Sequence, residues 1–256
     1  MGDSNDPATR PNRRSVLRAA GGALAGVAVA TAPAPVAAAD PSAHRRMARL
    51  AAENACGELD NGLCDYLDTV EEYADDPDDD PYHCPGWYPD RVCEVLDAVV
   101  RLREHGGTVD EKAATEAAAA KRRVDDGDYV EAAIETGRAL HFVQDAGTLV
   151  NAGREVEQAV DYDVRTEYER WLDETWNENF ADAADTGASE DVGSEDDVRN
   201  LTRTLADRTR EAIEDRWHDV EDPSEYDDET VAAQRDRIRD AAAVSNGTVR
   251  WIWENA

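Results

Sequence analysis

Residues 128–151 read DYVEAAIETGRALHFVQDAGTLVN. Six positions in this stretch recur at spacings of three or four residues and so share one face of a helix. They are Val130, Ile134, Gly137, His141, Asp145 and Thr148, with Leu140 and Phe142 widening the apolar side. We expect this face to point into the core, although it carries a histidine and a carboxylate one turn apart. Buried charges are costly unless they are paired or bound to a metal ion, so His141 and Asp145 form either a buried hydrogen bond or part of a metal site.

Most of the remaining chain shows the same helical periodicity. Helices are predicted at residues 44–56, 66–73, 91–105, 110–124, 128–148, 164–180, 198–220 and 229–253. Residues 74–89 are dense in proline and acid, and residues 181–197 are acidic and punctuated by glycine and serine, so both are predicted to be surface loops. No stretch has a convincing strand pattern. The sequence therefore predicts an all-α protein, an antiparallel helical bundle wrapped around the helix of His141.

The first 39 residues have the layout of a twin-arginine export signal. Residues 12–18 read NRRSVLR and precede an apolar run rich in alanine and glycine at 19–32. That run is too short and too small-sided for a membrane span, so we expect no transmembrane domain in the mature chain. Small residues offer cleavage sites after Ala30 and after Ala39. We expect secretion of a folded protein, with an uncleaved membrane anchor as the alternative.

Removing the leader leaves roughly 215 residues, enough for one domain with a substantial core at 40–256. The net charge is −31, and Lys112 and Lys121 are the only lysines. We interpret this acidic composition as typical of a protein that works in concentrated salt, which screens the repulsion between carboxylates. It also argues against free nucleic acid or an anionic membrane as an electrostatic partner.

Export makes the four cysteines more typical of disulfides than of a redox site: Cys56, Cys64, Cys84 and Cys93. Three pairings exist, and short loops favour Cys56 with Cys64 and Cys84 with Cys93. A zinc site built on cysteines is the competing interpretation, but no pair has the tight C-x-x-C spacing.

Residues 129–145, with LHFVQD at 140–145, resemble the metal-binding helix of the bacterial zinc-dependent phospholipases C, whose fold is shared with the fungal single-strand nucleases. Those proteins carry H-x-x-x-D on a central buried helix. The likeness extends to YAD at 73–75 with the following His83, to VRTEYE at 164–169, to His44 on the first predicted helix, and to the closing helix at 229–253. Order and spacing agree over most of the chain after the leader.

The resemblance implies a nearly complete zinc site. Two imidazoles and two carboxylates would bind one ion: Asp75, His83, His141 and Asp145. Such a mixture of nitrogen and oxygen ligands suits zinc. His44, with the mature N-terminal amine and a bridging Asp145, would hold a second ion. The position of His44 at a helix start equally fits an ordinary, partly exposed histidine.

Two departures from the family pattern affect its third ion. The chain has Asn151 and Arg165 where the family has ligand histidines, so of those three protein ligands only Glu169 remains. A guanidinium cannot bind a cation. Arg165 and Glu169 lie four residues apart on a predicted helix, so one interpretation is a simple salt bridge. In the other, Arg165 replaces the lost ion and binds a phosphate.

The resemblance implies hydrolysis of a phosphate ester by a reduced site with one or two zinc ions. Asp75 would orient or deprotonate a metal-bound water. The substrate would be a phospholipid or another phosphodiester, without a stable nucleic-acid partner, and the protein would be a monomer. The competing hypothesis is a secreted helical protein that keeps the fold, with a structural metal or none, and has lost turnover.

Overall fold

Helices account for every regular element in the part of the chain that the structure describes. The computed structural model describes residues 41–59, 62–77, 108–151, 162–214, 226–254 and 256, with the backbone alone at 162–165 and at 214. The elements are α1 (Ala43–Glu58), the 3-10 helix η2 (Leu63–Tyr66), α2 (Leu67–Tyr73), α4 (Val109–Asp125), α5 (Tyr129–Ala146), α6 (Tyr162–Asn179), α7 (Ala181–Ala184), α8 (Glu195–Glu214) and α10 (Asp228–Trp253). The prediction of an all-α protein is confirmed.

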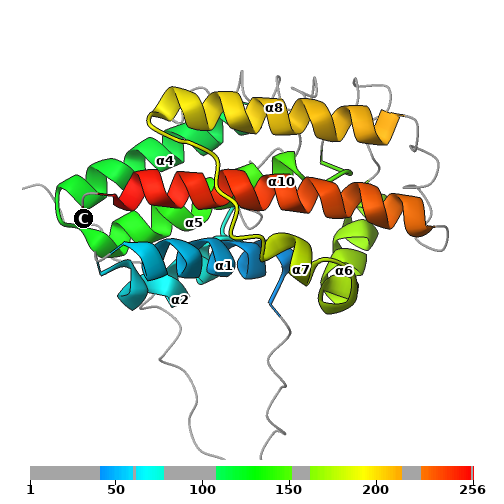
Figure 1. Cartoon of the computed structure of the whole chain (residues 1–256), viewed down its shortest axis with the longest axis horizontal. Helices are drawn as coiled ribbons and strands as arrows, with labels where there is room; N and C mark the ends of the chain where they lie inside the picture. Colours follow the sequence, from blue (N-terminus) through cyan, green and yellow to red (C-terminus); the bar gives the residue numbers. More distant parts are fainter. Residues whose placement is uncertain (1–40, 60–61, 78–107, 152–161, 215–225, 255) are drawn as a thin grey trace, which may run out of the picture. The chain divides into compact units, whose positions relative to one another are not determined.

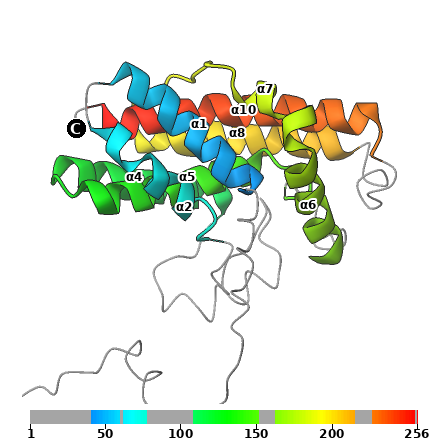
Figure 2. The same ribbon diagram turned by 90° about the horizontal axis from the view of Figure 1, so that it is seen from below.

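Helix α5, which carries His141, lies in the middle of the bundle. It contacts α1, α2, α4, α8 and α10, which lie around it in Figures 1 and 2. The long helices α8 and α10 run antiparallel side by side, and the chain reverses between α4 and α5 at Gly127, whose φ of 77° favours glycine. The predicted architecture around the His141 helix is therefore confirmed.

The predicted apolar face of α5 is wrong at its N-terminal end. Val130 is 52% exposed and Ile134 is only half-buried. In contrast, every residue from Ala139 to Asn151 is buried. The helix is enclosed on all sides along its second half, so its amphipathic pattern fades there, while its first turns extend to the surface.

Helix α2 approaches the α5 backbone closely because α5 has a glycine at the contact. A Cβ added at Gly137 would lie 2.6 Å from the carbonyl oxygen of Val70 and 3.0 Å from the carbonyl carbon of Tyr73. In the turn that follows α2, Asp76 accepts a hydrogen bond from Arg138 Nε at 2.7 Å and forms an ion pair with Arg138 Nη2 at 2.6 Å. These contacts hold the turn that follows α2, and with it Asp75, against the central helix.

Of the two predicted loops, the described part of the first agrees with the structure and the second does not. Residues 74–77 form a turn, as expected, but residues 181–197 are not a continuous loop, because they contain α7 and the first turn of α8. Ala183 and Ala184 are buried, and the Ser194 hydroxyl accepts a hydrogen bond from the backbone nitrogen of Asp197. Burial and this capping interaction therefore make helix where composition indicated loop. The predicted helix at 91–105 and residues 215–220 lie outside the described residues.

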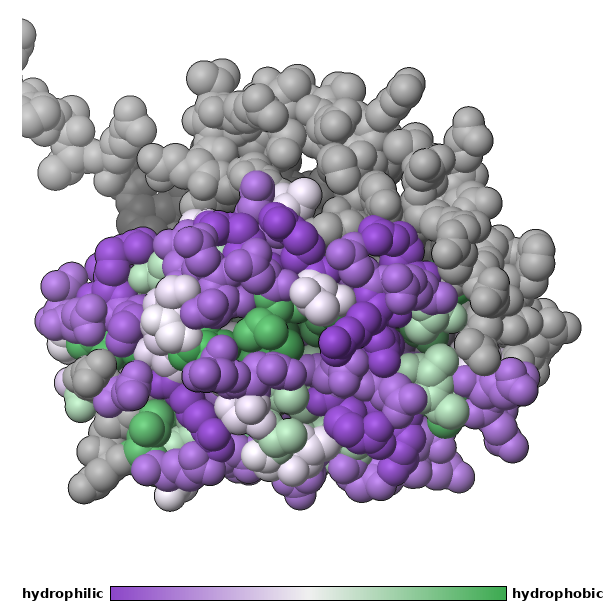
Figure 3. Space-filling model, turned by 45° about the horizontal axis from the view of Figure 1, so that its top comes forward, coloured by the Kyte–Doolittle hydropathy of each residue, from purple (hydrophilic) through white to green (hydrophobic). Residues whose placement is uncertain are grey.

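A disulfide joins Cys56 near the end of α1 to Cys64 in η2, as the loop lengths favoured. Cys84 and Cys93 lie outside the described residues, so their pairing stays a prediction. The face in Figure 3 is mainly hydrophilic, with small apolar areas between hydrophilic residues. Of the helices described, none is long and apolar enough to span a membrane.

Candidate functional site

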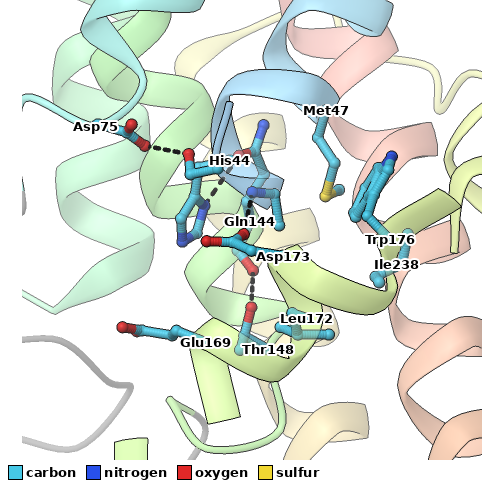
Figure 4. Close-up of a pocket in the computed structure, with 12 residues that line it drawn as sticks. His44, Met47, Asp75, Gln144, Thr148, Glu169, Leu172, Asp173, Trp176 and Ile238 are labelled. Atoms are coloured by element: carbon cyan, nitrogen blue, oxygen red, sulfur yellow. Dashed lines mark hydrogen bonds between the residues drawn. The ribbon is translucent and has the colours of Figure 1, made fainter. Parts of the chain in front are cut away.

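A cavity of about 300 Å³ opens where the start of α1 meets α5, α6 and α10. Figure 4 shows imidazole and carboxylate groups on one side and apolar side chains on the other. The lining residues are Ser42, Ala43, His44, Met47, Asp75, Gln144, Thr148, Glu169, Leu172, Asp173, Trp176 and Ile238. Three of the predicted site residues, from three separate segments, therefore share this cavity: His44, Asp75 and Glu169.

Behind the cavity, two histidines meet the carboxylate of Asp145. His141 Nε2 lies 3.4 Å from Asp145 Oδ2, and His44 Nε2 lies 3.6 Å from Asp145 Oδ1. The two imidazole ring centroids are 4.6 Å apart. His141 and Asp145 are at most 1% exposed. The fold thus brings the predicted pair on α5 together with the predicted histidine of α1, 97 residues earlier than His141 in sequence.

A backbone carbonyl fixes the orientation of the His141 ring. Nδ1 of His141 lies 2.8 Å from the carbonyl oxygen of Ala74, which can only accept a hydrogen bond. The Nδ1 atom therefore carries the hydrogen, and the Nε2 lone pair of the neutral ring faces Asp145. The imidazole nitrogen and the carboxylate oxygen that face each other at 3.4 Å are both groups that can coordinate a metal ion.

Asn151 contacts the same carboxylate. Its Nδ2 donates to Asp145 Oδ1 at 2.8 Å, and the side chain is only 3% exposed. The amide oxygen of Asn151 is buried and has no hydrogen-bond partner among the described residues. Where the family resemblance expects a ligand histidine, this chain therefore has a hydrogen-bond donor to Asp145.

Asp75 is held at the cavity by the start of α1. The Ser42 hydroxyl donates to Asp75 Oδ1 at 2.5 Å, while the same Ser42 oxygen accepts from the backbone nitrogen of Arg45 and caps the helix. The Ala74 carbonyl that orients His141 belongs to the preceding residue. The turn at Ala74 and Asp75 therefore orients the candidate ligand His141 and places the Asp75 carboxylate at the cavity.

Asp173 is a cavity residue that the sequence analysis missed. Its Oδ1 accepts the backbone N–H of Ala43 at 2.6 Å, and burial raises the pKa of its carboxyl group, while this hydrogen bond and His44 act in the opposite direction. Asp173 lies four residues after Glu169 on α6, so helical spacing alone places both carboxylates on one face. That spacing was the available signal.

Two of the predicted site residues have side chains outside the described part of the chain. His83 lies outside the described residues, as does the side chain of Arg165, so the roles of both stay predictions. Within the described residues, no group of three or more histidine, cysteine, aspartate or glutamate side chains closes around a metal position. Each of the two described histidines lies close to Asp145. The other carboxylates, those of Asp75, Glu169 and Asp173, line the adjoining cavity.

The all-helical bundle built around a buried H-x-x-x-D helix is the fold of the zinc-dependent phospholipase C type. Two solved structures share it. Alpha toxin from Clostridium absonum superposes with a TM-score of 0.60 at 16% identity, over 85% of this chain and 65% of the toxin. Clostridium perfringens alpha-toxin isolated from avian strain SWCP superposes with a TM-score of 0.58 at 13% identity, over 85% of this chain and 66% of the toxin.

This chain thus spans slightly less than two thirds of each toxin's length. At such low identity the likeness establishes the fold alone. No protein-family profile matches the chain. No curated protein matches it by sequence.

Proposed function

We propose that this protein is a secreted, metal-dependent phosphoric-ester hydrolase, a phospholipase C-like phosphodiesterase with a reduced zinc site. One observation carries the proposal: the buried Nε2 of His141 faces the carboxylate of Asp145 beside a cavity lined by His44, Asp75 and Glu169. The shared fold supports it. Export through the twin-arginine signal is part of the same proposal.

The described donors fit zinc chemically. Imidazole nitrogen and carboxylate oxygen are ligands that zinc accepts. The hydrogen bond from His141 Nδ1 to the Ala74 carbonyl is the outer-shell contact that metal-binding histidines usually have, because it fixes the tautomer and the ring orientation. When bound, zinc supplies a Lewis acid and lowers the pKa of a coordinated water.

The chain's own groups would prepare the reaction. Ser42 engages Oδ1 of Asp75, which leaves Oδ2 to orient a water molecule or accept its proton. Met47, Leu172 and Trp176 form an apolar wall that limits access of bulk water and leaves room for a leaving group. In this proposal Arg165 presents its planar guanidinium to a phosphate oxygen, with Glu169 four residues away on α6 holding one of its edges.

Activity measurements on the zinc-loaded full chain in concentrated salt test the proposal. We expect hydrolysis of bis(p-nitrophenyl) phosphate or of phospholipid vesicles that is lost on chelation. His141→Ala should remove both metal and activity, whereas Arg165→Ala should remove activity alone. Val130→Ala, at an exposed position on the same helix as His141, serves as the matched control. A wild-type protein that hydrolyses neither substrate after zinc loading contradicts the proposal.

The alternative is a non-enzymatic helical protein with a structural metal or none. Asn151 favours it, because its amide satisfies one oxygen of Asp145 by a hydrogen bond in place of metal coordination. Changing Asn151 and Arg165 together to histidine separates the two hypotheses. An added ion and faster turnover support a reduced enzyme, and a double variant that stays inert supports the non-enzymatic protein.

A further inference from the structure

We propose that His44 is not a metal ligand in this protein but a positioning residue, which Gln144 holds in the tautomer that turns an Nε2–H toward Asp145. The consequence, which rests on the proposed function, is that the centre holds at most one ion, on the His141 side of the carboxylate. This differs from the second ion that the sequence resemblance places at His44.

Two neighbouring residues on α1 determine which way the side-chain amide of Gln144 is oriented. One terminal atom of the amide lies 3.0 Å from both the carbonyl oxygen and Nδ1 of His44, and the other lies 3.2 Å from the backbone nitrogen of Ala48. An oxygen in the first position would face a carbonyl oxygen, and an NH₂ group in the second would face an N–H. The amide nitrogen therefore faces His44, and the amide oxygen accepts from Ala48.

This orientation fixes the hydrogen on the His44 ring. Nδ1 must offer its lone pair to the Gln144 amide, so the ring hydrogen of the neutral imidazole lies on Nε2. An imidazole nitrogen that carries a hydrogen has no lone pair for a metal. Gln144 is 2% exposed, so water does not compete readily for these contacts. Figure 4 shows the Gln144 side chain against His44 at the back of the cavity.

The two histidines therefore present opposite tautomers to one carboxylate. His44 turns Nε2–H toward Asp145 Oδ1 at 3.6 Å, the oxygen that already accepts from Asn151 at 2.8 Å. His141, whose Nδ1–H is bonded to Ala74, turns a lone pair toward Oδ2 at 3.4 Å. Among the described residues, hydrogen-bond donors thus gather at one oxygen of Asp145, and the nitrogen that can coordinate a metal ion lies at the other.

Long-range ¹H–¹⁵N correlation spectra of the metal-free full chain test the tautomers directly, with His44 and His141 assigned from single variants. We expect the His44 Nε2 signal of a protonated nitrogen and the His141 Nε2 signal of an unprotonated one. A His44 ring with its hydrogen on Nδ1 overturns the proposal. Gln144→Leu removes the amide donor, so the His44 ring hydrogen should no longer be held on Nε2. The His141 signals should stay unchanged.

Metal binding supplies the second arm. We expect no more than one zinc per chain, bound equally well by wild type and by His44→Gln, which keeps an N–H near the position of Nε2. Gln144→Glu offers Nδ1 an acceptor, so it should move the hydrogen to Nδ1 and allow a second ion. Two ions in wild type, or loss of the ion in His44→Gln, overturns the proposal. A chain that binds no zinc at all contradicts the proposed function, while the spectra still decide the His44 tautomer.

Discussion

The imidazole of His141 on α5 is bonded through Nδ1 to the carbonyl oxygen of Ala74, at 2.8 Å and across 67 residues of sequence. The bond connects the central helix to the turn that carries Asp75. It also sets which nitrogen of His141 faces Asp145. A single backbone acceptor therefore couples the packing of α2 against α5 to the chemistry of the candidate site.

This relationship predicts different outcomes for two substitutions of His141. Asparagine keeps an N–H near the position of Nδ1, whereas alanine leaves the buried Ala74 carbonyl without its donor. We expect His141→Ala to be less stable than His141→Asn by about 1 kcal/mol, the net value of a typical hydrogen bond. Both variants lose Nε2, so neither should bind zinc. Denaturant unfolding and zinc titration measure the two effects, and equal stabilities would show that the Ala74 contact is not stabilising.

The close contact at Gly137 predicts a loss of stability on adding one methyl group. A Cβ there would lie 2.6 Å from Val70 O, a backbone atom that cannot move alone. We expect Gly137→Ala to lower the free energy of unfolding by about 1–3 kcal/mol through overpacking. Gly57→Ala is the matched control, because Gly57 lies in α1 and a Cβ there meets nothing within 4 Å. That change should instead add about 0.5–1 kcal/mol. Similar effects at both glycines would contradict the packing argument.

A pair of glutamates between α4 and α5 predicts a pH-dependent stability. Burial, followed by the hydrogen bond to Glu135 and the charge of Glu135, raises the pKa of Glu116 to about 8, while Arg138 and Lys112 oppose this shift. The folded state therefore binds a proton that the unfolded state releases above pH 4.5, so this group's contribution to stability falls as the pH rises toward 8.

Glu116→Gln removes this penalty. At pH 8 we expect the variant to be more stable than wild type, by an amount on the order of 1 kcal/mol. At pH 5, where Glu116 is protonated in the folded state, the two proteins should differ little. Thermal unfolding at both pH values measures the difference. Glu131→Gln, at an exposed position on the same helix as Glu135, should show no such change with pH. A gain that is equal at pH 5 and pH 8 would be inconsistent with titration of Glu116.

The disulfide between Cys56 and Cys64 should stabilise the folded protein, because it lowers the conformational entropy of the unfolded chain. Their sequence separation is 8, and closing so short a loop corresponds to about 2.5 kcal/mol in the chain-entropy model. We expect the double change to serine to lower the denaturation midpoint in urea while the helical circular dichroism of the folded state is retained. A double variant as stable as wild type would show that the bond contributes nothing measurable.

Much of the fold followed from the sequence, because helical periodicity depends on neighbours three and four residues apart. That local pattern located α1, α2, α4, α5 and the core of α10, and it placed His141 and Asp145 on one buried helix. Loop length alone favoured the Cys56–Cys64 pair. Prediction from the local sequence was wrong at Val130 and at α7, because exposure and burial there depend on how the helices pack in the tertiary structure.

By itself, the sequence determined the helical class of this protein, its buried His–Asp pair and the set of residue types from which a metal site could be drawn. Only the tertiary structure decided how those residues are used. The acceptor for His141 is the backbone carbonyl of Ala74, and a carbonyl has no side-chain signature that a sequence can reveal. Gln144 and Asp173 gain their roles from contacts with residues 100 and 130 positions away. Hydrogen-bond direction depends on which atoms meet in space, so the tautomers of the two histidines could be assigned only once the helices were packed together.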